Sequence, residues 1–229
     1  MNGEKNQTVR DAASVVMVRD ADRNPSILMG QRGAKAAFMP NKFVFPGGAL
    51  DASDCKVPLA SPPNEMCVAR LGARSDPALA IPLVLAAIRE VWEETGLLIG
   101  RASADAHGDA LNVPRDWRNF FRRGVVPDGE GMRFFFRAIT PPGRPRRFDA
   151  RFFVVDAARV IGDPDDFSEA SHELSHLQWI PLADARLFDL PFITEVVLAE
   201  LEADLETPGR NARVPFFFNA QGRSNFLRL

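Results

Sequence analysis

The chain has 229 residues, of which 46% are hydrophobic and 25% charged, a composition that suits a globular domain with its own core. Its 28 basic and 30 acidic side chains give a net charge of −2, which argues against a general nucleic-acid-binding surface. The two cysteines form no CxxC pair, and no apolar run reaches the roughly 18 residues of a membrane span. The N-terminus is polar and lacks the apolar stretch of a signal peptide, so we expect a cytoplasmic protein without a membrane partner.

The first half of the chain predicts strands, a loop and one long helix. Apolar runs at 13–19 and 26–32 indicate two strands joined by a turn. Residues 38–51 are expected to form a loop around a short strand, because prolines and glycines interrupt them. The segment 55–78 is rich in Pro, Ala and Ser, and we expect it to be irregular and to be an insertion. Apolar residues at helical spacing then predict a helix over 79–95, ended by the glycine that follows.

The second half alternates between strand and helix patterns. Strands are predicted at 97–100, 132–139, 151–157 and 176–182, and helices at 115–123 and 191–206. The Phe-rich runs at 134–136 and 216–218 suit the core or a homodimer interface. No repeat or linker divides the chain, so we expect a single α/β domain over 1–229, with 207–229 as a C-terminal extension.

The most informative stretch is REVWEETGLL, from Arg89 to Leu98, at the end of the predicted helix. Glu90 and Glu94 are four residues apart, so they share a helix face and repel each other by about 0.2–0.5 kcal/mol. Negative charge at a helix C-terminus costs about another 0.3–1 kcal/mol. An Arg89–Glu93 pair offsets only part of this. A divalent cation would turn the repulsion into binding, whereas the plainer alternative is a solvated acidic surface.

An upstream loop, FPGGALDASD, supplies a second signal. Its two glycines, Gly47 and Gly48, allow the backbone to approach a ligand closely, and free amides and carbonyls there can face phosphate or metal. Taken alone, the PGG sequence indicates only a turn.

Together these segments resemble the Nudix hydrolase family, whose box is a glycine, five residues, a glutamate, seven residues and then R-E-U-x-E-E-x-G-U, where U is apolar. The second half is complete here, from Arg89 through Glu90, Glu93 and Glu94 to Leu97. The first half fits from Gly48, with Asp54 in place of the glutamate. The spacer departs from the pattern, because 34 residues separate Asp54 from Arg89 where seven are usual.

An interrupted box behind an FMP…FPGG loop resembles the branch related to peroxisomal coenzyme A diphosphatases. Those enzymes carry an upstream arginine thirteen residues before the FPGG phenylalanine, and Arg32 stands at that spacing from Phe45. The second arginine of their motif falls on Ala37, and its glycine falls on Asn41, so the match to coenzyme A as substrate is incomplete.

The resemblance implies a Nudix-type α/β/α sandwich with a mixed central sheet and an insertion within the box. It also implies metal-dependent hydrolysis of the pyrophosphate bond of a nucleoside diphosphate derivative. Mg²⁺ or Mn²⁺ is the expected cofactor. By this resemblance Glu90, Glu93, Glu94 and a Gly47 or Gly48 carbonyl would bind metal, and Glu93 would alternatively orient a metal-bound water. Arg89 would hold a glutamate in place.

The remaining site residues are expected around this centre. The general base of the family varies; Glu173, six residues before Trp179, fits best, and Glu169 is second. Arg32, Phe45, Gly47, Gly48 and Arg147 are the expected substrate-binding residues. Arg147 belongs to the arginine-rich segment 141–151, which could clamp a phosphate or form a solvated hairpin tip.

Several substrates and two other functions stay open. Coenzyme A or an acyl-coenzyme A leads, followed by nucleotide sugars, dinucleotides and modified nucleoside triphosphates. A non-catalytic nucleotide-binding module of the same fold is one alternative. HELSH at 172–176 formally matches the HExxH zinc-protease motif, which works only on a helix, whereas the following residues alternate as in a strand.

Overall fold

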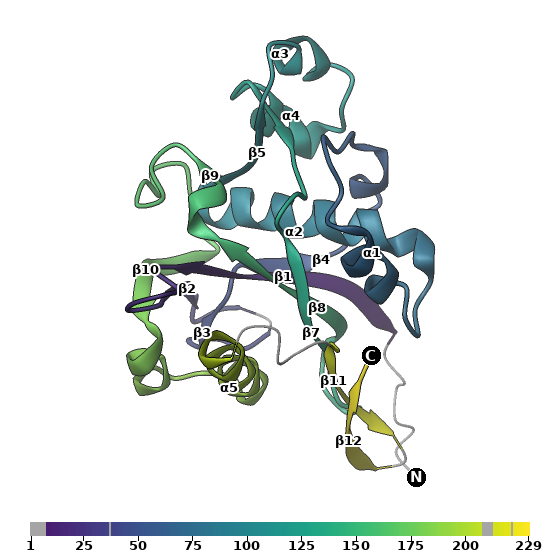
Figure 1. Ribbon diagram of the computed structural model, residues 1–229, viewed down its shortest axis with the longest axis vertical. Coiled ribbons are helices and arrows are strands. Elements are labelled where there is room, and N and C mark those ends of the chain that lie inside the picture. The colour runs from purple at the N-terminus through teal and green to yellow at the C-terminus, as the bar shows by residue number, and fades with distance from the viewer. Residues whose placement is uncertain (1–7, 37, 208–212, 221) are drawn as a thin grey trace.

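The computed structural model describes residues 8–36, 38–207, 213–220 and 222–229. Its centre is a mixed sheet with a helix on each face, which confirms the expected α/β/α sandwich (Figure 1). The strands of this sheet in the described part of the chain are β1 (Val9–Arg19), β2 (Ser26–Arg32), β3 (Phe43–Val44), β4 (Gly47–Ala49), β7 (Arg133–Ile139), β8 (Arg147–Asp156), β10 (Leu174–Pro181), β11 (Pro215–Ala220) and β12 (Arg223–Arg228). Their order is β10-β2-β1-β8-β7-β11-β12, with β3 beside β2 and β4 beside β1.

The helices and a smaller sheet complete the molecule. The helices are α1 (Glu65–Leu71), α2 (Ala80–Thr95), α3 (Ala106–Asp109), α4 (Arg118–Phe121) and α5 (Phe192–Glu206). Short 3-10 turns are η1 (Asp54–Lys56), η2 (Pro77–Leu79), η3 (Arg115–Trp117), η4 (Ala157–Arg159) and η5 (Leu182–Leu187). The smaller sheet has the order β6 (Val125–Pro127), β5 (Leu98–Ala102), β9 (Val160–Ile161). In Figure 1, β5, α3 and α4 extend beyond α2, on the side away from α5. Among the described residues no helix is long and apolar enough to cross a membrane.

Strand β1 lies at the centre of the sandwich, and side chains on both of its faces are buried. Val15 and Met17 pack in the cluster beneath α2, whereas Val16 and Val18 pack in the cluster beneath α5. The strand pairs in parallel with β8 and antiparallel with β2 and β4. A continuous apolar strand at the centre of a two-sided sheet therefore fixes where α2 lies relative to the β4 loop.

Helix α2 matches its prediction within one residue. It ends at Thr95, and Gly96 adopts the left-handed conformation with a φ of 77°. The Gly96 N–H donates to the Trp92 carbonyl at 2.9 Å, which satisfies one of the last free carbonyls of the helix. The glycine thus ends the helix directly after the acidic turn.

The prediction that 55–78 is irregular is wrong. This segment contains η1, the helix α1 and η2, and Cys67 and Leu71 pack into the core beneath α2. Asn64 caps α1 by accepting the Cys67 N–H at 2.9 Å. The helix has only seven residues between proline-rich flanks, so its periodicity is too short to stand out from the sequence.

Candidate active site

Arg89 and Asp54 form a buried ion pair that joins α2 to η1. Arg89 Nε and Nη2 donate to the two Asp54 carboxylate oxygens at 2.9 and 3.1 Å. The same carboxylate accepts the Asp51 backbone N–H at 2.9 Å and the Trp117 indole N–H at 3.1 Å. Asp54 is fully buried, so these donors are what balances and orients its charge. The two halves of the interrupted motif therefore meet in space.

The carboxylates of Glu90 and Glu94 reach the double-glycine loop. The Gly47 N–H donates to Glu94 Oε2 at 2.8 Å. A Cβ added at Gly48 would lie 2.3 Å from Glu90 Oε1, so only glycine leaves room for that carboxylate. Both glycines lie on β4, which pairs with β1, and α2 packs against β1 as well. One central strand therefore holds the loop and the helix in register.

The charged forms of these two carboxylates are disfavoured. Burial first, and then the neighbouring Glu90 charge, raise the pKa of Glu94 to about 8, although the hydrogen bond from the Gly47 N–H lowers it. Burial also raises the pKa of Glu90 to about 7, although the Arg89 guanidinium lowers it. Glu94 is only 2% exposed. A pair of buried carboxylates with raised pKa values is a place where a cation would be favourable.

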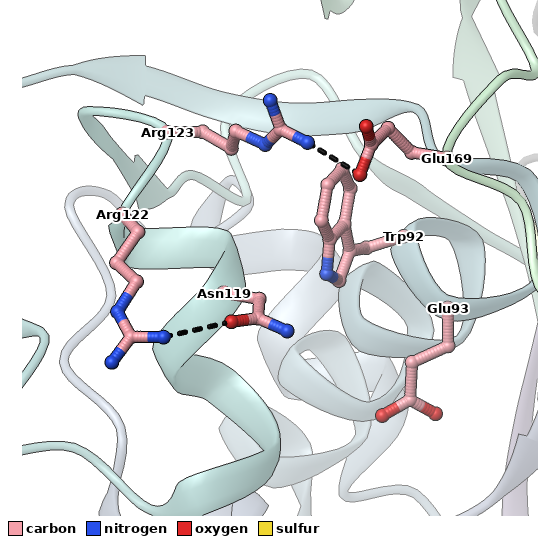
Figure 2. A pocket seen from close by; sticks show the side chains of 6 residues that line it. All are labelled: Trp92, Glu93, Asn119, Arg122, Arg123 and Glu169. Carbon is pink, nitrogen blue, oxygen red and sulfur yellow. Dashed lines mark hydrogen bonds and ion pairs between the residues drawn. The ribbon is translucent and has the colours of Figure 1, made fainter.

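The Glu93 side chain does not share the buried position of Glu94. Arg89 Nη1 donates to Glu93 Oε2 at 3.0 Å, so the predicted i, i+4 pair is present, and the same nitrogen donates to Glu90 Oε1 at 2.8 Å. The Glu93 side chain is 39% exposed, and it lines a cavity of about 490 Å³ (Figure 2). The structure thus brings Glu90 and Glu94 to the glycine loop and leaves Glu93 at its margin.

The donors at this site suit a hard divalent cation. Carboxylate and backbone carbonyl oxygens are the ligands that magnesium and manganese prefer. No group of three or more carboxylate, imidazole or thiol side chains that could hold a metal forms among the described residues. Two carboxylates with few further protein ligands still fit magnesium, which usually keeps several waters and binds substrate phosphates.

Arg32 and Glu173 lie within electrostatic reach of the two carboxylates. The Arg32 charge lowers the pKa of Glu94 among larger opposing effects, and Arg32 Nε is buried without a hydrogen-bond partner. The Glu173 charge is among the smaller causes that raise the pKa of both Glu90 and Glu94. Glu173 is exposed and directly precedes β10, so its carboxylate remains a general-base candidate. Ala37, the motif position that lacks its arginine, lies outside the described residues.

Two of the predicted substrate-binding residues, Phe45 and Arg147, are separated from the carboxylates. Phe45 is 4% exposed and packs edge-to-face on Phe152, so its ring belongs to the core beneath the loop. Arg147 pairs with Val9 on β1, four residues from the Gly48 register, about 13 Å along the strand. It donates to the Thr140 carbonyl at 3.1 Å. The structure therefore does not bring Phe45 or Arg147 to the acidic cluster.

The remaining competing signals also find structural places. Arg151, in the same arginine-rich segment, is 1% exposed and pairs with Asp11, so it supports the fold. Residues 172–176 enter the strand β10 and form no helix, and His176 has a φ of 52° at an irregular position. The helical geometry that a HExxH zinc site requires is absent from this described segment. Glu169 forms an ion pair with Arg123 at the cavity of Figure 2.

Sequence reasoning missed Trp117 as a member of the site. Its indole reaches Asp54 across 63 residues, from η3 in the region beyond α2. A single tryptophan between charged and polar neighbours carries no local signal of such a contact. Only the packing of η3 and α4 against α2 places it there.

Comparisons with known proteins find relatives among curated sequences and solved structures. No protein-family model matches the chain. The chain is 26% identical over 185 residues to a putative nudix hydrolase 7 of Caenorhabditis elegans, covering 78% of this chain and 53% of that protein. It is 31% identical over 141 residues to an acyl-coenzyme A diphosphatase, NUDT19, of Gallus gallus, covering 47% of this chain and 37% of that protein.

Solved structures extend the similarity over most of the chain. A NUDIX hydrolase from Alicyclobacillus acidocaldarius matches with a TM-score of 0.64 and 27% identity, covering 88% of this chain and 97% of that one. The NUDIX domain of Shewanella oneidensis NrtR, solved with ADP ribose, matches with a TM-score of 0.50 and 13% identity over 90% of this chain and 94% of that one, a likeness of fold alone. The chain spans about half, or less, of the length of the two curated relatives described above.

Proposed function

The chain belongs to the Nudix hydrolase family, and from this membership we propose that it hydrolyses the pyrophosphate bond of a nucleoside diphosphate derivative. The observation that carries the proposal is the meeting of Glu90 and Glu94 with the Gly47–Gly48 loop. Members of the family generally use divalent metal ions. We propose Mg²⁺ or Mn²⁺ here, held by Glu90, Glu94 and a Gly48 carbonyl, with Glu93 at the edge.

The chain's own residues would prepare this site for an anionic substrate. A bound divalent ion supplies charge neutralisation and activation of water. Arg89 orients Glu90 and Glu93 through its two hydrogen bonds from Nη1, while Asp54 fixes the other side of the guanidinium. Glu173 is the proposed general base, because it is exposed and its charge reaches Glu90 and Glu94.

Coenzyme A or an acyl-coenzyme A is the proposed substrate class. The name of the Gallus gallus relative supports it, as does the place of Arg32 near Glu94 with an unpartnered, buried Nε. Gly47 and Gly48 would line the site of the diphosphate as well as that of the metal. Phe45 would support the loop from the core. Arg147 is separated from the carboxylates, so it would contact only a distant part of a long substrate.

The decisive experiment is product analysis over coenzyme A, NADH, ADP-ribose and 8-oxo-dGTP, with magnesium or manganese and after chelation. Glu94→Gln removes the ionised ligand with little change of volume, and we expect kcat/KM to fall at least about 100-fold. Glu195→Gln, exposed on α5 across the sheet, is the matched control and should keep full activity. Equal turnover by all three proteins, or turnover that survives chelation, would contradict the proposal; binding without turnover would favour the nucleotide-binding module.

A further inference from the structure

Apart from Glu93, the residues that line the cavity beside α4 have no part in the proposed chemistry. It measures about 490 Å³ and borders the acidic turn of α2 on one side and α4 on the other (Figure 2). Its lining residues are Trp92, Glu93, Asn119, Arg122, Arg123 and Glu169. Glu93 lines the cavity and also accepts a hydrogen bond from Arg89, so the cavity lies next to the acidic turn.

One wall of the cavity is formed by Trp92 and the side chains that pack on it. The Arg123 guanidinium lies 5.7 Å from the centre of the Trp92 ring and pairs with Glu169. Phe120 packs edge-to-face on the same tryptophan, with ring centres 6.1 Å apart. Trp92 is only 9% exposed, so the covered indole offers little surface on which a nucleotide base could stack. The wall therefore presents the Arg123 guanidinium rather than an aromatic platform.

The second arginine that lines the cavity is Arg122. Arg122 is exposed and, within the described part of the chain, its guanidinium has the Asn119 amide oxygen at 3.2 Å as its hydrogen-bond partner and no carboxylate. Arg122 and Arg123 both line the cavity, and Arg122 has no compensating carboxylate among the described residues, so its guanidinium attracts a negatively charged group. The planar fork of arginine matches phosphate oxygens in particular.

We propose that this cavity binds a phosphomonoester of the substrate that is not part of the scissile diphosphate. Arg122 would donate to it directly, and Arg123, held by Trp92 and Glu169, would add charge. The proposal rests on the proposed function, because the diphosphate at Glu90 and Glu94 brings the additional phosphate to the cavity. It makes α4 a determinant of substrate choice, while the chemistry stays on α2.

Matched ligand pairs test the subsite. In hydrolysis assays the pairs are coenzyme A with its 3′-dephospho form and NADP with NAD. The preference for the phosphate-bearing member, as a ratio of kcat/KM values, should fall about tenfold in Arg122→Met, mainly through KM. Arg115→Met is the matched control, because Arg115 is exposed on the neighbouring η3 turn and does not line the cavity. It should keep the preference of the wild type.

A binding arm separates this proposal from the proposed function. Calorimetric titration with adenosine 3′,5′-bisphosphate and with adenosine 5′-monophosphate, in chelator, requires no turnover. We expect the wild type and Arg115→Met to bind the bisphosphate about tenfold more tightly, and Arg122→Met to lose that difference. Equal affinities in the wild type, or a difference that survives in Arg122→Met, would overturn the subsite. Failure of every diphosphate to be hydrolysed would instead overturn the proposed function.

Discussion

Gly48 is the residue at which backbone geometry and site chemistry meet most closely. A Cβ there would lie 2.3–2.4 Å from the carboxylate of Glu90, closer than atoms can approach. We therefore expect Gly48→Ala to displace Glu90 and to lower kcat/KM about 100-fold while the protein remains folded. Gly33→Ala is the matched control, because a Cβ at Gly33 has no atom within 4 Å. Similar activity of the two variants would show that Glu90 does not act at the loop.

Asp54 illustrates how one substitution within a motif is accommodated. The family's box has a glutamate here, and aspartate is one methylene shorter. In this chain the carboxylate reaches Arg89 through two hydrogen bonds and also receives the Trp117 indole N–H. A buried carboxylate costs free energy unless donors surround it, and the contact from η3 supplies one of them.

At the scale of elements, α1 is a part of the insertion whose N-terminus has an identifiable cap. The Asn64 side chain accepts the Cys67 N–H at 2.9 Å, and the helix carries Cys67 and Leu71 into the core. We expect Asn64→Ala to lower the free energy of unfolding by about 1 kcal/mol, measured by urea denaturation. Asp105→Ala is the control, since Asp105 precedes α3 without a side-chain capping bond. Equal losses in the two variants would contradict the capping role.

At the scale of the whole molecule, the raised pKa values predict how stability depends on pH. The pKa of Glu94 is raised from an ordinary 4.5 to about 8 by burial first, and that of Glu90 to about 7. Between about pH 4.5 and 8 the folded protein therefore holds protons that the unfolded chain releases. Stability of the metal-free protein consequently falls as the pH rises through this window.

Thermal unfolding in chelator measures this effect. We expect the unfolding temperature to be several degrees lower at pH 8 than at pH 6, given about 2–4 °C per kcal/mol for a chain of this size. Glu94→Gln should flatten the dependence, because the amide does not titrate, and added magnesium should stabilise the wild type most at pH 8. A pH dependence that is the same in Glu94→Gln and in the wild type would refute the assignment.

The larger architecture also shows why the segment 207–229 could not be placed from sequence. Its described residues include β11 and β12, which extend the central sheet beside β7 (Figure 1). β11 pairs in parallel with β7, more than 70 residues earlier in the chain. Strand pairing of this kind depends on distant partners, so a Phe-rich run indicates a strand without indicating its neighbour.

The sequence by itself determined the acidic turn, its glycine end and the central strands, because each has a local periodicity or a fixed spacing that backbone geometry imposes. It also predicted that α2 would carry the site. Only the tertiary structure decided which side chains meet: it joined Asp54 to Trp117, separated Arg147 from the glutamates and placed Arg122 at the cavity beside Glu93. Those relations depend on how elements distant in the chain pack around β1, and local patterns of residues do not record such contacts.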